Sequence, residues 1–237
     1  WLKIKSLSMF SWCLSSPSNI GEMSAEKITV YYWPVHMRCG ALLYMLNEKG
    51  ASYEHVSDRA EMAKFATAFG APNGVNIAPP IIDDNGKFIS QSTACTMYLG
   101  KKLGFDKGVD DCFAMQYLCD IVDWCEGGIG KNNEDAAALK NFMEGGRFNA
   151  MAGCVERNIK GPFFFGDSPS YVDFFLLQHM DWRKSLLDKL QEKTGKDFLE
   201  SCPKIKAVVS ALRELPSYKS FEIKYGGPFK QEIIDSY

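Results

Sequence analysis

The chain has 237 residues, of which 46% are hydrophobic and 24% are charged, as in an ordinary soluble globular protein. The formal net charge is −2, which does not favour a nucleic-acid-binding surface, and no stretch approaches the roughly 18 apolar residues of a membrane span. This length accommodates one large domain or two small ones.

The cysteine pattern argues against a metal site. No two of the eight cysteines have CxxC spacing, no cysteine–histidine cluster suggests zinc, and the three histidines are scattered. Most of the cysteines lie in apolar, helical surroundings, which predicts buried free thiols in a reducing compartment. They are Cys13, Cys39, Cys95, Cys112, Cys119, Cys125, Cys154 and Cys202.

The N-terminal segment, residues 1–22, is rich in serine, basic at Lys3 and Lys5, and only weakly amphipathic. Three interpretations stay open. The segment is a targeting remnant, an arm that docks on a partner, or sequence upstream of a start at Met23.

The first regular elements follow this segment. Residues 27–33 are β-branched and aromatic, which predicts a strand that ends at Pro34. Residues 38–49 have helical spacing of apolar positions, and Gly50 is placed to stop that helix. Residues 53–56 predict a second strand.

The stretch 76–98 combines three local signals. Pro79-Pro80 precedes two short apolar strands that flank Asn85-Gly86, the strongest short-range signal for a β-hairpin. Ser92 then begins a helix, whose N-terminus offers backbone N–H groups that suit a carboxylate or a phosphate. The alternative is an ordinary hairpin that leads into a helix, with the polar residues serving only as caps.

The second half of the chain predicts helices throughout. Residues 136–159 form an apolar stripe that Gly145-Gly146 weakens, Ser170 and Asp173 have the spacing of a capping box, and residues 203–215 form the last long helix. An earlier helix carries a predicted buried stripe of Met115, Leu118, Cys119, Val122 and Cys125.

Several motifs, taken together and in this order, make the chain resemble a cytosolic glutathione transferase between Lys27 and Phe221. The similarity is greatest to the pi, sigma and mu classes, which use a tyrosine. The motifs are Tyr32-Trp33-Pro34-Val35 with Arg38-Cys39, Pro80 at the position of the family's cis-proline, Gln91-Ser92, and Phe165-Gly166-Asp167 followed by Ser170-x-x-Asp173.

The resemblance implies the architecture and the activity. We expect an N-terminal extension at 1–24, a thioredoxin-like α/β glutathione-binding domain at 25–104, and an all-α helical domain at 105–237. The implied reaction is detoxifying conjugation of the glutathione thiolate to a small hydrophobic electrophile, or a sigma-like isomerisation. Glutathione is the co-substrate and no metal is needed. A cytoplasmic homodimer is implied, with an organelle as the alternative if residues 1–22 are a targeting remnant and with a possible protein partner for the extension.

Tyr32 is the catalytic candidate. The nucleophile is the thiolate, and a tyrosine hydroxyl that donates to sulfur lowers the thiol pKa. The resemblance assigns this role to Tyr32, and the residues agree, because Tyr32 lies at the carboxyl end of a strand, where α/β sheets bind ligands. The alternative is a packed strand aromatic. Tyr31 faces the opposite side.

The resemblance also implies the other glutathione contacts. The N–H groups of Gln91 and Ser92, with the Ser92 hydroxyl, would hold the γ-glutamyl carboxylate. Arg38 would lie near the glutamyl end, and Ala78 and Pro79 would face the cysteinyl backbone.

Three further positions have weaker assignments. Trp33 either walls the pocket or is a core tryptophan, and Lys64 or Phe65 would meet the glycine carboxylate. The family often supplies an acidic residue from the partner subunit near Asp120 and Asp123, although a solvated helix face explains these two residues equally well.

Two departures from the family pattern favour an alternative function. His36-Met37 stands where the family has Arg-Gly, and Pro79 has no N–H to give to the cysteine of glutathione. The alternative is a non-catalytic scaffold or a subunit of a larger assembly. A thiol–disulfide oxidoreductase is disfavoured, because CxxC is absent.

Overall fold

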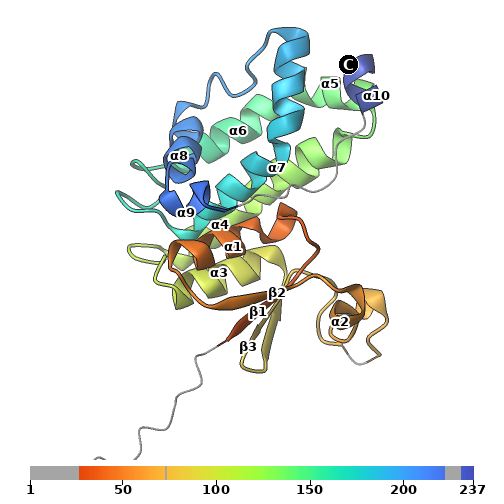
Figure 1. Ribbon diagram of the computed structural model, residues 1–237. Helices are drawn as coiled ribbons and strands as arrows, with labels where there is room; N and C mark the ends of the chain where they lie inside the picture. Colours follow the sequence, from red (N-terminus) through yellow and green to blue (C-terminus); the bar gives the residue numbers. More distant parts are fainter. Residues whose placement is uncertain (1–26, 73, 222–230) are drawn as a thin grey trace, which may run out of the picture.

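The computed structural model describes residues 27–72, 74–221 and 231–237, with an α/β part followed by a helical part (Figure 1). The expected extension at 1–24 lies outside the described residues. The elements of the α/β part are β1 (Ile28–Tyr31), the 3-10 turn η1 (Met37–Cys39), α1 (Gly40–Glu48), β2 (Tyr53–Val56), α2 (Arg59–Ala63), the 3-10 turn η2 (Thr67–Phe69), β3 (Ile81–Asp84), β4 (Lys87–Ser90) and α3 (Ser92–Lys102).

The four strands form one mixed sheet in the order β2-β1-β3-β4. β1 is parallel to β2 and antiparallel to β3, and β3 and β4 form the predicted hairpin. Asn85 and Gly86 both have positive φ, 54° and 87°, as a two-residue hairpin turn requires. The turn residues therefore set the register of this half of the sheet.

The two faces of the sheet are covered differently. Ile28 and Val30 are buried on the face that α1 and α3 cover, and these two helices lie between the sheet and the helical part (Figure 1). On the other face, the ring of Phe65, just after α2, stacks on Phe88 of β4 and contacts Tyr31 of β1, with centroids 4.7 and 5.1 Å apart. The layered core holds the strand ends in fixed positions.

The helical part is built around α7, whose first half is buried on all sides. Its N-terminus carries the predicted capping box, in which Asp173 accepts hydrogen bonds from the Ser170 N–H and hydroxyl. The elements are α4 (Asp111–Val122), the π-helical segment η3 (Asp123–Gly130), α5 (Ala136–Glu144), α6 (Arg147–Asn158), α7 (Tyr171–Thr194), α8 (Pro203–Arg213), α9 (Pro216–Lys219) and α10 (Gln231–Ser236).

The α/β part and the helical part are joined through α7. The Ala41 N–H of α1 donates to Gln178 Oε1 at 2.9 Å, and the Tyr44 hydroxyl donates to Asp181 at 3.0 Å. Gly100 on α3 permits the close approach, because a Cβ there would lie 2.3 Å from the Tyr171 side chain. Helices α1 and α3 are therefore held against the helical part.

The structure confirms the predicted fold class, a thioredoxin-like α/β unit followed by helices, and corrects several details. The first strand is shorter than residues 27–33, and the 136–159 stripe is two helices, broken where Gly146 has φ 84°. The stripe predicted along 115–125 is partly wrong, since Met115 and Cys119 are exposed. The buried residues of that stretch are Tyr117, Leu118, Ile121, Trp124 and Cys125.

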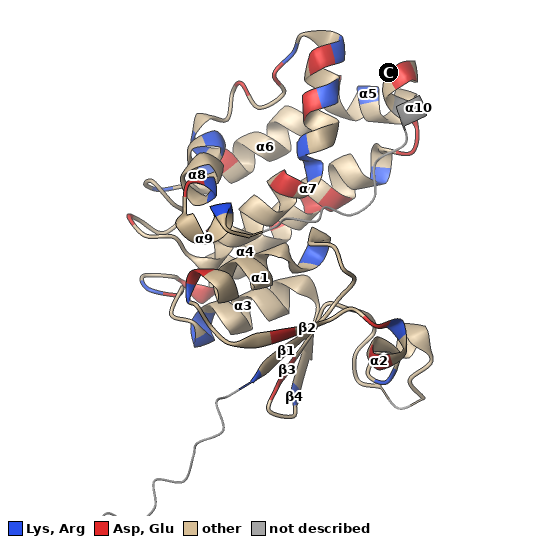
Figure 2. Cartoon of the chain, viewed as in Figure 1, with Lys and Arg blue, Asp and Glu red and all other residues tan. Residues whose placement is uncertain are grey.

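The charged side chains of the described residues lie mainly on the helices and loops, with both signs interspersed along the far end of α7 (Figure 2). None of the described helices combines the length and the apolar character needed to cross a membrane. Within the same residues, no group of three or more His, Cys, Asp or Glu side chains is arranged to hold a metal ion.

Candidate functional site

The candidate site lies at one end of the sheet, where three chain segments meet. Tyr31 pairs with Ile81 across β1 and β3, and Ile81 pairs with Ser90 across β3 and β4. The next residue of each segment therefore lies at the same edge, beyond the last paired residues. Those residues are Tyr32, Pro80 and Gln91, and the Pro79–Pro80 bond is cis, as expected.

Tyr32 is almost fully buried at this edge, with 4% of its surface exposed. Its backbone N–H extends the β1–β2 pairing by donating to the Val56 carbonyl at 3.1 Å, and its hydroxyl accepts the Arg38 N–H at 3.3 Å. Burial raises the pKa of Tyr32 to about 12, against a smaller lowering effect of that hydrogen bond. The phenol therefore keeps its proton at neutral pH and can donate it in a hydrogen bond.

Arg38 connects this edge to the helical part. Its guanidinium forms an ion pair with Glu126 in η3, and the other oxygen of Glu126, Oε1, lies 3.2 Å from Nε2 of His179 on α7. Burial alone would raise the pKa of Glu126, but the hydrogen bonds and charges of His179 and Arg38 outweigh it, and the pKa is lowered. Glu126 therefore stays ionised and holds the loop that carries Arg38.

The local geometry that presents Glu126 is a π-helical segment. Such segments are rare and are often found at functional sites, because the wider turn re-aims the side chains. The sequence motifs do not point to Glu126, although its position four residues after Val122 is a usable signal. Asp120 on α4 is half-buried and accepts a hydrogen bond from Gln116, and Asp123, the first residue of η3, is exposed.

The N-terminus of α3 has an unusual backbone. Gln91 has φ 74°, a left-handed conformation that is strained for a residue with a side chain, and its side chain does not cap the helix. By contrast, aspartate side chains cap α2, α4 and α5. The N–H groups of the first turn, at Ser92, are therefore available for an anion. The alternative, in which the polar residues serve only as helix caps, does not explain why no side chain caps α3.

The remaining predicted residues fall into two groups. Ala78 and Pro79 are half-buried beside the cis bond, and Trp33 is half-buried with its ring edge-on to Phe69 at 5.5 Å. Lys64, by contrast, ends α2 on the exposed surface, where it forms an ion pair with Glu61. Six of the eight predicted residues lie at the sheet edge, in the loops next to it or at the start of α3. They are Tyr32, Arg38, Ala78, Pro79, Gln91 and Ser92. Trp33 extends towards the η2 loop, and Lys64 is separate from the other predicted residues.

The cysteines near the site are inert thiols. Cys39 and Cys95 are fully buried, and burial raises the pKa of Cys95 to about 12 and that of Cys39 well above its usual value. The expectation of burial holds for these two, for Cys125 and for Cys202, but Cys112 and Cys119 are exposed and Cys154 is half-buried. Thiol chemistry by the buried pair is disfavoured.

Replacing Glu126 by glutamine is expected to lower the free energy of unfolding by about 2 kcal/mol, because a partly buried charged pair and its hydrogen bond to His179 are lost. Urea unfolding followed by circular dichroism measures it. Glu214→Gln is the control, since Glu214 and Lys219 form an exposed pair, worth under about 0.5 kcal/mol. Equal losses in the two variants would contradict a structural role for the Arg38–Glu126–His179 contacts.

Comparison with known proteins agrees with the fold. Residues 127–224 match the family model of the glutathione S-transferase C-terminal domain, whereas no curated protein sequence matches the chain. A Nu-class glutathione transferase from Haemonchus contortus is 18% identical, with a TM-score of 0.60 over 81% of this chain and 94% of that one. Prostaglandin synthase D of Nilaparvata lugens is 18% identical, with a TM-score of 0.59 over 82% and 96%.

A third solved structure, maleylacetoacetate isomerase from Anaeromyxobacter dehalogenans with glutathione bound in its active site, is 18% identical, with a TM-score of 0.53 over 83% of this chain and 94% of that one. At such identities the likeness concerns the fold. The chain therefore has the fold of the glutathione transferases, and its residues 127–224 match the model of the C-terminal domain of that family.

Proposed function

We propose that this protein is a glutathione transferase that conjugates the glutathione thiolate to small hydrophobic electrophiles. The observation that carries the proposal is the pairing of a protonated tyrosine with an uncapped helix N-terminus at one sheet edge. Tyr32 supplies a phenol that keeps its proton at neutral pH, and Gln91 and Ser92 open α3 without a capping side chain. A thiol at one end of a ligand and a carboxylate at the other fit this arrangement.

The mechanism follows from these groups. The Tyr32 hydroxyl, which already accepts the Arg38 N–H, would keep its proton and donate a hydrogen bond to the glutathione sulfur, which favours the thiolate. The Ser92 end of α3 would hold the γ-glutamyl carboxylate, with Arg38 near it and with Ala78 and Pro79 against the cysteinyl backbone. Pro79 can accept a hydrogen bond there but cannot donate one.

The remaining parts of the proposal concern the whole chain. We assign glutathione binding to residues 25–104 and the electrophile side to residues 105–237, with Trp33 as a pocket wall and Lys64 as the partner of the glycine carboxylate. Isomerisation is the related activity, supported by the name of one similar structure, the maleylacetoacetate isomerase. The seven described cysteines are all free thiols, which supports a reducing location such as the cytoplasm.

A homodimer is part of the proposal. The described residues expose large apolar side chains on the loop before β3 and on α4, where Val75, Ile77 and Phe113 are 88%, 64% and 54% exposed. Exposed apolar side chains of this size support an interface with a second copy, although single ones are common on monomers. Sedimentation equilibrium decides between a monomer and a dimer.

The second candidate function is a non-catalytic scaffold on the same fold. Two observations favour it: Tyr32 is only 4% exposed, and Pro79 replaces a residue that would donate to glutathione. Losing that hydrogen bond weakens glutathione binding by about 1 kcal/mol without excluding it. The proposed enzyme therefore remains the better supported candidate.

The experiment that separates the two candidates combines retention on immobilised glutathione with turnover of dinitrochlorobenzene, a general aryl halide. The transferase is expected to be retained, to elute with free glutathione, and to form the conjugate. Absence of both retention and turnover leaves the scaffold. A protein that is retained without turnover binds glutathione but does not activate its sulfur towards this electrophile.

A further inference from the structure

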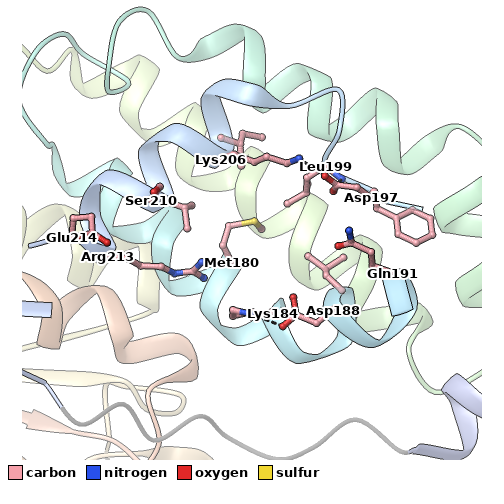
Figure 3. A pocket seen from close by; sticks show the side chains of 14 residues that line it. Met180, Lys184, Asp188, Gln191, Asp197, Leu199, Lys206, Ser210, Arg213 and Glu214 are labelled. Carbon is pink, nitrogen blue, oxygen red and sulfur yellow. Dashed lines mark hydrogen bonds and ion pairs between the residues drawn. The ribbon is translucent and has the colours of Figure 1, made fainter. Parts of the chain in front are cut away.

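A groove lies in the helical part, away from the sheet edge, between α7 and α8. It has a volume of about 340 Å³, within the range of small-molecule sites, and residues 197–199 close one side of it (Figure 3). None of its lining residues comes from residues 27–104, so it is separate from the candidate glutathione site. Its apolar lining consists of Met180, Leu187, Phe198, Leu199, Ile205 and Val209.

The floor of the groove is part of the packed core. Met180, Ile205 and Val209 are buried, and the Met180 side chain points into the space between the two helices (Figure 3). Leu187 and Phe198 are half-buried walls. An apolar ligand would cover these walls and contact a preformed floor, and the flexible thioether can adapt to its shape.

The charges at the rim are already neutralised by neighbours. Lys184 pairs with Asp188 on α7, and Lys206 pairs with Asp197 across the groove opening. Arg213 donates from Nε to buried Asp181 at 2.9 Å. Since these cations have carboxylate partners, the rim attracts an ionic ligand weakly, and burying an ion here would cost desolvation energy without a new partner.

Glu214, also in the lining, pairs with Lys219, and two uncharged polar side chains complete the lining. Ser210 on α8 lies towards one end of the groove and Gln191 on α7 towards the other (Figure 3). Either can hydrogen-bond to a hydroxyl or a carbonyl. We propose that the groove binds one uncharged, mostly apolar small molecule of about two fused rings, with a hydroxyl or carbonyl end directed at Ser210.

Fluorescence titration of the full chain tests this proposal with two probes of one ring system, naphthol and naphthalene sulfonate. S-hexylglutathione is kept at saturation to occupy the candidate active site. One naphthol is expected to bind per chain, and the anionic sulfonate at least tenfold more weakly. Ser210→Trp fills the groove from an exposed rim position and is expected to weaken naphthol binding at least tenfold.

The matched control is Ser185→Trp. Ser185 is an exposed serine of α7 outside the lining, so this change adds the same side chain without filling the groove, and naphthol binding should be unchanged. Leu187→Gln, a change in one wall, should also weaken binding and serves if Ser210→Trp fails to fold. Equal naphthol affinity in the wild type and the folded groove variants, or tighter binding of the sulfonate, would overturn the proposal. Neither result depends on whether the chain transfers glutathione.

Discussion

Replacing Tyr32 by phenylalanine is expected to lower the rate of glutathione conjugation about 10²-fold, since a hydroxyl that stabilises the thiolate contributes ~3 kcal/mol. The pKa of the bound thiol should rise, because the charged form loses its hydrogen bond. The pH–rate profile of the variant should therefore move to higher pH. Burial holds the pKa of Tyr32 itself at about 12, so its own ionisation should leave no step in the wild-type profile near neutrality.

The neighbouring residue offers a matched control for this change. Tyr31→Phe removes the same hydroxyl from a side chain on the opposite face of the sheet, where its ring packs against Phe65. The conjugation rate of that variant should stay within about twofold of the wild type, a change below ~0.5 kcal/mol. If both variants turn over at the wild-type rate, the Tyr32 hydroxyl has no part in the mechanism.

Replacing Asp173 by alanine is expected to lower the free energy of unfolding by about 4 kcal/mol. The carboxylate is fully buried and accepts three hydrogen bonds, from the Phe164 N–H at 3.0 Å, the Ser170 N–H at 2.8 Å and the Ser170 hydroxyl at 2.6 Å. Alanine leaves these donors buried without an acceptor. Urea unfolding followed by circular dichroism measures the loss.

Asp135→Ala is the control for this change. Asp135 caps α5 from an exposed position by accepting the Ala138 N–H at 2.7 Å, and the loss of such a cap costs about 1 kcal/mol. A loss for Asp173→Ala that is no larger than that for Asp135→Ala would mean that the buried capping box does not hold the start of α7.

Asp173 also gives a pH dependence with a definite sign. Burial raises its pKa from 3.8 to about 6 in the folded protein, so the folded state binds the proton more tightly than the unfolded state. Its contribution to stability is complete below pH ~4 and is lost as the pH rises through ~6. The stability–pH curves of the wild type and Asp173→Asn should therefore diverge over this interval. Parallel curves would contradict the raised pKa.

Local chemistry explains which parts of the fold could be predicted. The hairpin turn needs two positive φ angles, which Asn85 and Gly86 adopt at low cost, and the Ser170–Asp173 box satisfies its own backbone donors. Both features depend on residues close in sequence, and both were found from the sequence. The break at Gly146 is also local, but we predicted only a weakened stripe.

The buried face of α4 shows where such reasoning fails. The apolar side chains of α4 are spread around the helix, so the helical periodicity of the sequence is consistent with more than one buried face. The predicted face contained Met115 and Cys119, whereas the helices packed against α4 bury Tyr117 and Ile121 instead. The choice of face is a property of the partners, which the periodicity of one segment does not contain.

The sequence by itself determined the order of the four strands with α1 and α3 among them, the turn that sets the hairpin register, and the residues that follow each strand. Those signals are local, since they depend on backbone conformations and hydrogen bonds that neighbouring residues decide. Only the tertiary structure decided that Glu126, 88 residues from Arg38, forms an ion pair with it, and that the Tyr32 phenol is buried and protonated. Burial and charge pairing arise when distant segments exclude water together, so no single stretch of sequence encodes them.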